Sequence, residues 1–334
     1  MNSHELSAPN RVGFVVIGRN EGNRLHSALA SVDQAIGLLV YVDSGSSDGS
    51  CSAARSSGAN VVELDHRRPF SAARGRNAGV AELLRLAPGT RYIQFLDGDC
   101  ALTPSWTEIA AKHLDSRPDL CATFGRLREL NPAASIFNAL ANIEWNVPTG
   151  LADSFSGVAM VRVTALQETT GYDETVIAGE EVELCMRMRQ RGWFIECIAE
   201  DMSTHDAAID HVDQWFTRAK RSGYGMAQVA EKTRHASNFA YRREIGRSLG
   251  WTAVLVATAI FAIRHPRRLT LGVGPIAGQW MRIYFRIRSG DHSRPIARAY
   301  ATSMIAGHVP QAIGIVQYHL DQRRHRVPKI IEYK

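Results

Sequence analysis

Two aspartates, Asp97 and Asp99, stand one residue apart directly after the apolar run 92–96. The run is typical of a buried strand, and alternate residues of an extended chain point the same way. The two carboxylates can therefore converge on one object, and because like charges repel at that distance, a hard divalent cation is their natural ligand. Ligands of open α/β folds bind at the ends of sheet strands. The alternative is a pair of aspartates in an ordinary turn around a glycine.

Three further apolar runs precede this strand, and longer stretches compatible with helices separate them. The runs are residues 12–17, 38–42 and 61–64. Short apolar runs that alternate with helix-length segments indicate βαβ units and a parallel sheet. Three of the four runs end in polar, glycine-bearing loops. In a parallel sheet such loops lie on one edge, so their residues can share a site.

Short polar motifs follow one another along the chain in a distinctive order. They are Asn20-Glu21, Asp43-Ser44-Gly45-Ser46-Ser47-Asp48-Gly49, Arg74-Gly75-Arg76-Asn77-Ala78-Gly79, Leu96-Asp97-Gly98-Asp99 and Gly179-Glu180-Glu181-Val182-Glu183-Leu184. As an ordered set they resemble family 2 glycosyltransferases of the GT-A fold, over roughly residues 11–225. The resemblance implies a Rossmann-like α/β nucleotide-sugar domain with a mostly parallel central sheet. It also implies transfer of a sugar from a nucleotide-sugar donor.

The resemblance assigns metal chemistry to the residues around the two aspartates. Asp99 is expected to bind Mg²⁺ or Mn²⁺, with Asp97 in contact with ribose or a metal-bound water. Such a cation stabilises charge on the departing diphosphate. His205 is expected to complete the metal or diphosphate site, and a structural histidine is the alternative.

Further residues are expected to bind the nucleotide. In the family pattern Asp43 faces the base or ribose, and a carboxylate there accepts a hydrogen bond from an N–H or hydroxyl group. The next residue is serine where many relatives have a second acid, so the identity of the nucleotide base is not assigned. Asn20 and Glu21 end the first strand, where Glu21 is either a ribose contact or a helix-start acid. Arg74 or Arg76 would add positive charge near the diphosphate, or lie solvated on a helix that leads to residue 86.

Glu181 is expected to be the catalytic base. The family motif has Gly-Glu-Asp at this point, and Glu181 keeps the carboxylate with one more methylene. Residues 182–190 have the spacing of a helix that Gly192 ends. Glu180 and Glu181 then lie at its N-terminus, where the helix dipole favours the ionised form that a base needs. The alternative is that both are ordinary acids of a first helical turn, and Glu180 and Glu183 are weaker candidates for the base.

The net charge of +6 conceals two halves of opposite sign. From Gln214 onward there are 21 Lys and Arg against 5 Asp and Glu, whereas the first 213 residues have 18 against 28. A basic half indicates a polyanionic partner surface. Two apolar blocks, 250–263 and 269–281, with flanking arginines and aromatic residues, favour an anionic membrane over nucleic acid. A buried helical subdomain with a solvated basic face is the alternative.

The sequence thus predicts a catalytic region, 1–225, and a helical, basic, hydrophobic region, 226–334, that meets a membrane or packs on protein. Block 250–263 is too short for an ordinary bilayer span, so peripheral or re-entrant association is expected. The first ten residues have no apolar core of a signal peptide. The five cysteines show no Cys-x-x-Cys pairing and fit a reducing cytosol. The expected location is therefore the cytoplasmic face of the cell membrane.

Together these expectations describe an inverting, metal-dependent transferase similar to bacterial exopolysaccharide and cell-envelope sugar transferases. By resemblance the default donor is a UDP-hexose, and the expected acceptor is a lipid-linked saccharide in polysaccharide biosynthesis. The order Gln214-Trp215-Phe216-Thr217-Arg218 departs from the Gln-x-x-Arg-Trp pattern of processive synthases and favours addition of a single sugar. A polyprenyl-phosphate sugar transferase and a non-catalytic scaffold that binds a nucleotide sugar or a membrane are the alternatives.

Overall fold

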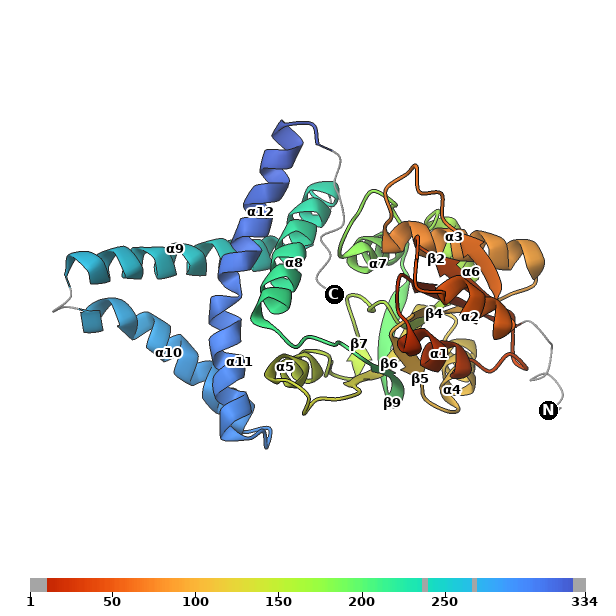
Figure 1. The fold of residues 1–334 in the computed structure, drawn as a ribbon, viewed down its shortest axis with the longest axis horizontal. Coiled ribbons are helices and arrows are strands. Elements are labelled where there is room, and N and C mark those ends of the chain that lie inside the picture. The colour runs from red at the N-terminus through yellow and green to blue at the C-terminus, as the bar shows by residue number, and fades with distance from the viewer. Residues whose placement is uncertain (1–10, 236–239, 266–268, 327–334) are drawn as a thin grey trace. The chain divides into compact units, whose positions relative to one another are not determined.

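Residues 11–235, 240–265 and 269–326 are described by the structure, which is a computed structural model (Figure 1). The chain divides into two units. The N-terminal unit comprises Met1–Leu130 and Glu144–Ala207, and the C-terminal unit comprises Asn131–Ile143 and Ala208–Lys334. The predicted boundary at residue 225 lies within a helix of the C-terminal unit, and the division into a catalytic and a membrane region stays a prediction.

A mixed sheet forms the centre of the N-terminal unit. Its parallel half has the order β3-β2-β1-β4 and consists of β1 (Val12–Gly18), β2 (Leu39–Asp43), β3 (Asn60–Glu63) and β4 (Tyr92–Asp97). The rest continues from β4 through β8 (Ala159–Arg162), β6 (Leu120–Glu129), β9 (Phe194–His205) and β5 (Cys100–Leu102), while β7 (Gly150–Leu151) also pairs with β9. The longest pairings, β1 with β4 and β6 with β9, are parallel. The predicted α/β class and the four predicted strands are confirmed.

Register explains why the polar loops meet. Gly18 pairs with Asp43, and Ile17 pairs with Asp97, so the carboxyl ends of β1, β2 and β4 lie level with one another. Because these strands are parallel neighbours, the loops that follow them share one edge of the sheet, as the sequence predicts.

Helices cover this sheet. Those of the N-terminal unit are α1 (Asn23–Ala30), α2 (Ser50–Ser56), α3 (Ala72–Leu86), α4 (Trp106–Ser116), α6 (Val163–Glu168) and α7 (Glu180–Gln190). Helix α3 packs on β1 and β2 at Gly79, where any Cβ would overlap the side chain of Val15. Helix α4 packs on β6 and buries Trp106, whose indole N–H donates to Gln94 Oε1 at 2.9 Å.

The C-terminal unit is helical. Its helices are α5 (Ile136–Glu144), α8 (Val212–Lys232), α9 (Arg242–Arg264), α10 (Leu269–Arg288), α11 (Arg294–Ala306) and α12 (His308–Arg323). Helices α8 and α12 pack together, with the rings of Tyr224 and Tyr318 edge to face at 5.3 Å. A second small core gathers Leu140, Ile283, Tyr300, Ala301 and Ile305.

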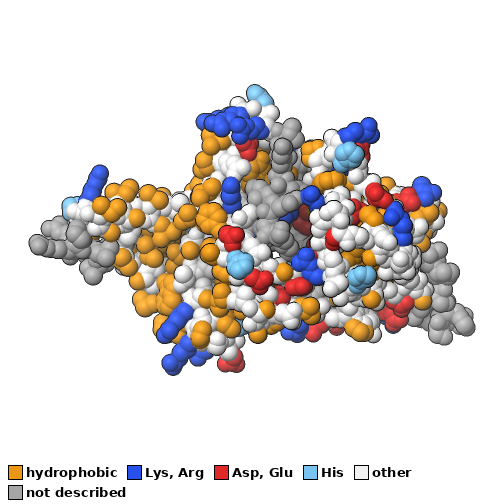
Figure 2. All heavy atoms as spheres, in the orientation of Figure 1, with side chains coloured by type: hydrophobic (Ala, Val, Ile, Leu, Met, Phe, Trp, Pro, Cys, Tyr) orange, Lys and Arg blue, Asp and Glu red, His pale blue; other side chains and the backbone are white. Residues whose placement is uncertain are grey.

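Helix α9 is longer than the predicted apolar block. Residues 242–249, which include three arginines, and Arg264 extend it to 23 residues. It is the one helix among those described that is long and apolar enough to cross a membrane, by length and composition alone. Only 6% of its most apolar stretch is buried. On the face shown in Figure 2, hydrophobic side chains cover much of α9 and α10. Exposed ones include Val254, Val256, Ile260, Ile263 and Phe285.

Candidate active site

The two aspartates after β4 have different charged partners. Asp97 Oδ1 accepts a hydrogen bond from Arg76 Nη2 at 3.0 Å, whereas Asp99 Oδ2 lies 3.1 Å from His205 Nε2. Asp99 is also the more enclosed of the two, with 9% of its side chain exposed against 36% for Asp97. The structure therefore divides the pair into an enclosed acid beside a histidine and a more open acid paired with an arginine.

Asp99 and His205 meet because β5 and β9 pair antiparallel, with Cys100 opposite His205. Ligand atoms of Asp99, Cys100 and His205 all lie within 4.8 Å of one another. The carboxylate oxygen and imidazole nitrogen suit Mg²⁺ or Mn²⁺, whereas a soft thiol does not. Nδ1 of His205 is buried and has no hydrogen-bond partner among the described residues, and the ring lies 4.5 Å from that of Trp145. This donor set fits a divalent cation.

Arg76 is the centre of the second cluster. Its Nη1 lies 2.8 Å from Glu180 Oε1 and 2.9 Å from Glu181 Oε1, while Nη2 bonds Asp97. The guanidinium side chain is only 3% exposed. Helix α3 supplies the arginine, the first turn of α7 supplies both glutamates, and β4 supplies the aspartate. One buried cation thus joins the expected base to the aspartate pair.

Charge and burial set the protonation of this cluster. Burial acts to lower the pKa of Arg76, but the charges of Glu181 and Asp97 outweigh it and raise that pKa well above its usual value. Burial raises the pKa of Glu181 to about 7, and the charge of Glu180 adds to the rise while Arg76 opposes it. The expectation that the helix N-terminus would keep Glu181 readily ionised is therefore wrong in direction, because desolvation dominates. A carboxylate with a pKa near 7 is matched to proton transfer at neutral pH.

Two neighbours fix the geometry of Arg76. The ring of Tyr172 lies 5.5 Å from the guanidinium carbon, a cation–π distance. At Gly157 any Cβ would overlap Asp97 Oδ2 and press on Arg76 Nη2. The side chain of Asn77 fixes the loop before α7 with two hydrogen bonds. Its Nδ2 donates to the Tyr172 carbonyl at 2.8 Å, and its Oδ1 accepts from the Tyr172 N–H at 2.9 Å.

Arg74 has a different place from Arg76. It donates to the backbone carbonyls of Asp65, Arg68 and Pro69, at 2.9, 2.9 and 3.2 Å. These bonds fold the loop before α3. Of the two arginines between which the sequence leaves the choice open, the structure therefore brings Arg76 to the acidic cluster.

Asp43 is buried at the end of β2 and organises its own loop. Its carboxylate accepts hydrogen bonds from the N–H groups of Gly45 and Ser46, at 2.9 and 2.8 Å, and from the Tyr41 hydroxyl at 3.1 Å. Asn20 stabilises the same loop, because its backbone N–H donates to Ser46 Oγ and its side-chain Oδ1 accepts from the Ser47 N–H. A nucleotide contact by Asp43 would use the remaining lone pairs.

Glu21 precedes α1 and forms an ion pair with Arg24 at 3.0 Å. Asp48 accepts from the N–H groups of Gly22 and Ser50, so it ties the first two loops together at the start of α2. Glu183 forms two hydrogen bonds with Arg187, at 2.7 and 2.6 Å, which removes it as a free carboxylate.

Sequence reasoning missed the supporting residues. The sequence assigned no role to Tyr172, Gly157, Asn77 or Trp145, although Asn77 belongs to a motif that carries the family resemblance. The position of Asn77 within that motif is the available signal. Trp145 has no such signal, since only the fold brings it to His205.

Comparisons with known proteins agree with this architecture. Residues 14–149 match the family described as glycosyl transferase family 2. Two proteins of Mycobacterium tuberculosis, from strains CDC 1551 and H37Rv, each named pre-mycofactocin glycosyltransferase, are 24% identical to the chain over 213 residues. The match covers 60% of this chain and 43% of each relative, so the chain spans less than half of their length.

Solved structures share the fold. The mannosyltransferase PcManGT from Pyrobaculum calidifontis, in complex with GDP-Man and Mn²⁺, superposes with a TM-score of 0.56 at 18% identity, covering 93% of this chain and 88% of that one. TarS residues 1–349 from S. aureus, in complex with UDP, gives 0.50 at 12% identity, covering 95% and 92%.

Proposed function

Because this chain is a family 2 glycosyltransferase with a GT-A fold, we propose that it transfers a sugar from a nucleotide sugar with inversion, using Glu181 as the base. The observation that carries the proposal is the shared guanidinium of Arg76, which lies 2.9 Å from Glu181 and 3.0 Å from Asp97. Arg76 holds Glu181, whose pKa is raised, beside the carboxyl ends of β1, β2 and β4. Ligands of open α/β folds bind at this edge of the sheet.

Glu181 would take the proton of an acceptor hydroxyl. The hydroxyl oxygen then bonds to the anomeric carbon from the face opposite the diphosphate, while the bond from that carbon to the phosphate oxygen breaks. The configuration inverts, and a nucleoside diphosphate leaves. Arg76 remains charged throughout and limits the repulsion between Glu180 and Glu181 when both are ionised.

Asp99 and His205 are the proposed metal ligands. A divalent cation held there would stabilise negative charge on the departing diphosphate. The distant structural relative PcManGT contains Mn²⁺ together with GDP-Man, which supports this assignment. Asp43 and Asn20 shape the loop beside β2 that would receive the base and ribose.

The proposed acceptor is a lipid-linked saccharide at the cytoplasmic membrane face, as in polysaccharide biosynthesis. Exposed apolar side chains of α9 and the net charge of +16 from Gln214 onward support it. The proposed donor is a UDP-hexose, and the GDP-Man of the mannosyltransferase makes a GDP-sugar the competitor to include.

The test is release of nucleoside diphosphate from UDP- and GDP-sugars, with Mn²⁺ or with EDTA. We expect metal-dependent release for one donor class, and loss of it in Glu181→Gln. The matched control is Glu108→Gln, which changes an exposed carboxylate on α4. Release that neither EDTA nor Glu181→Gln reduces would contradict the proposed chemistry.

A further inference from the structure

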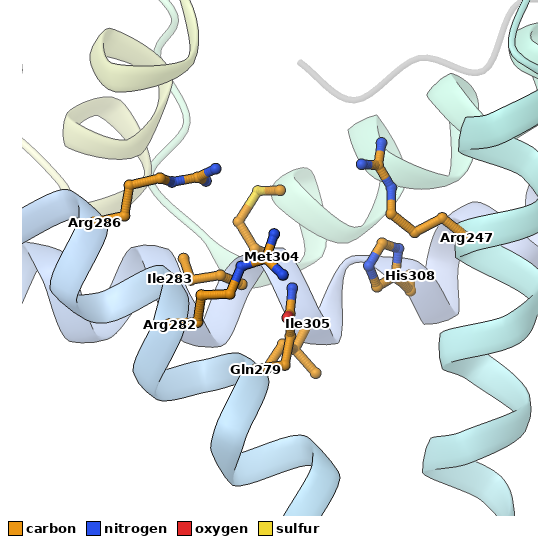
Figure 3. Close-up of a pocket in the computed structure, with 8 residues that line it drawn as sticks. All are labelled: Arg247, Gln279, Arg282, Ile283, Arg286, Met304, Ile305 and His308. Carbon is orange, nitrogen blue, oxygen red and sulfur yellow. The ribbon is translucent and has the colours of Figure 1, made fainter.

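A pocket within the C-terminal unit gathers positive charge. Residues Arg247 of α9, Arg282 and Arg286 of α10, and His308 of α12 line it, together with the side chains of Gln279, Ile283, Met304 and Ile305. Its volume is about 100 Å³, more than a single water molecule needs. Figure 3 shows Arg247 beside His308 at one end of the pocket and Arg282 on the opposite helix.

The positive charges of this pocket are not neutralised within the described part of the chain. None of the described residues that line the pocket is acidic. Arg282 and Arg286 form no ion pair with any described residue, and Arg247 has only a long contact, 4.0 Å, with Glu244. Like charges that face one space repel one another, so an anion that enters would stabilise the arrangement.

His308 gives a second, independent indication. It is 8% exposed, and its Nδ1 is buried without a hydrogen-bond partner among the described residues. The backbone of His308 is fixed, because its carbonyl accepts from Thr252 Oγ1 at 2.9 Å. A buried ring nitrogen left unpaired in a protein costs free energy that a bound ligand can recover.

The composition of the pocket identifies the class of ligand. Guanidinium groups match the oxygens of phosphate with paired N–H donors, and a neutral imidazole adds one more donor. Ile283 and Ile305 make one wall apolar, which suits a phosphate attached to an organic group. We propose that this pocket binds a phosphate or diphosphate group, carried either by a lipid headgroup or by a soluble compound. The site is separate from the acidic cluster around Arg76 and does not depend on the transferase proposal.

The test uses the full chain with EDTA present, so that metal-dependent binding at Asp99 does not contribute. Inorganic pyrophosphate, titrated by calorimetry, probes a soluble ligand. Phosphatidylcholine vesicles with and without phosphatidylglycerol, followed by co-sedimentation, probe a headgroup. We expect Arg282→Gln to weaken binding of at least one probe about tenfold, the usual effect of losing one charge-assisted bond.

The matched control is Arg298→Gln on α11, which removes the same charge from an exposed arginine outside the pocket. If Arg282→Gln loses binding of pyrophosphate alone, the ligand is a soluble phosphate. If it loses binding of the vesicles alone, the ligand is a lipid headgroup. Arg247→Gln should repeat the result from the other side of the pocket, and melting temperatures check that each variant is folded. Binding to neither probe, or equal loss in Arg282→Gln and Arg298→Gln, overturns the proposal.

Discussion

Glu181 and Asp97 bind different nitrogens of one buried guanidinium, at 2.9 and 3.0 Å. Glu181 lies in the first turn of α7 and Asp97 ends β4, yet neither can change its charge without affecting the other through Arg76. The proposed base and the proposed donor site are therefore coupled electrostatically, and the following predictions separate their contributions.

Replacing Glu181 by Gln should lower kcat by about 10²–10⁴, the usual worth of a general base, and change nucleotide affinity far less. The amide keeps the size of the side chain but cannot take a proton. Steady-state kinetics and a UDP or GDP titration measure the two quantities. A fall in nucleotide affinity without a fall in kcat would make Glu181 a binding residue.

The rate should rise with pH through about 7, because burial and Glu180 raise the pKa of Glu181 to that value and only the ionised form accepts a proton. Folding stability should change in the opposite direction. Between the ordinary pKa of 4.5 and about 7 the folded state holds a proton that the unfolded state releases, so stability falls as pH rises through this window.

The loss of stability is on the order of 3 kcal/mol at most, at 1.36 kcal/mol per pKa unit. Denaturant titrations of the metal-free protein between pH 5 and pH 8 should show this slope, and Glu181→Gln should flatten it. Equal slopes in the two proteins would assign the pH dependence to other groups.

Arg76→Gln should destabilise the fold by about 3–5 kcal/mol, since it leaves buried carboxylates without their cation. Arg76→Lys keeps the charge but lacks the planar fork, so it should recover only part of the loss. If Arg76→Lys folds, the pH at which its rate is half-maximal shows how the lysine alters the pKa of Glu181. Chemical denaturation reports the stability, and a neutral effect of Arg76→Gln would mean that the cluster is not buried in solution.

Asp99→Asn should abolish Mn²⁺-dependent nucleotide binding and transfer while the protein stays folded, because the amide is a weaker, uncharged ligand for a hard cation. Calorimetric titration of UDP or GDP with and without Mn²⁺ measures this. Glu108→Gln, which changes an exposed carboxylate on α4, is the control that should retain metal dependence. Unchanged metal dependence in Asp99→Asn would refute the ligand assignment.

Val256→Asp with Ile260→Asp should weaken binding to anionic vesicles, because the two exposed side chains lie one turn apart on α9 and supply an apolar contribution that salt does not screen. Val212→Asp, on another exposed site, is the control. Co-sedimentation at low and high salt separates the apolar from the ionic contribution. Failure of the full-length protein to co-sediment with anionic vesicles at low salt would refute membrane association.

The parts predictable from sequence are those that local pattern determines. Runs 12–17, 38–42, 61–64 and 92–96 became neighbouring parallel strands. Those that form β1, β2 and β4 are buried because each has a strand on both sides, whereas β3 at the edge is partly exposed. The first turn of α7 was likewise predictable from the spacing before Gly192.

Local sequence pattern does not reveal pairing between distant segments, and the expectation that His205 completes the metal site came only from the family resemblance. Asp99 meets His205 only through the β5–β9 pairing, and Arg76 rather than Arg74 reaches α7 only because of how α3 sits on the sheet. The pKa of Glu181 depends on desolvation, which a helix position alone does not reveal.

The packing of α8 against α12 limits how α9 can meet a bilayer. Helix α9 has 23 residues and, at 1.5 Å each, is about 35 Å long, enough to cross once. Yet the chain enters α9 after α8 and must return to α12, which packs against α8. An even number of crossings is therefore required. Helix α10 would have to be the return crossing, although it contains Arg282, Arg286 and Arg288, which are costly within lipid. An α9–α10 hairpin that dips into one leaflet satisfies this parity without burying those arginines, and it leaves α8 and α12 in the same compartment.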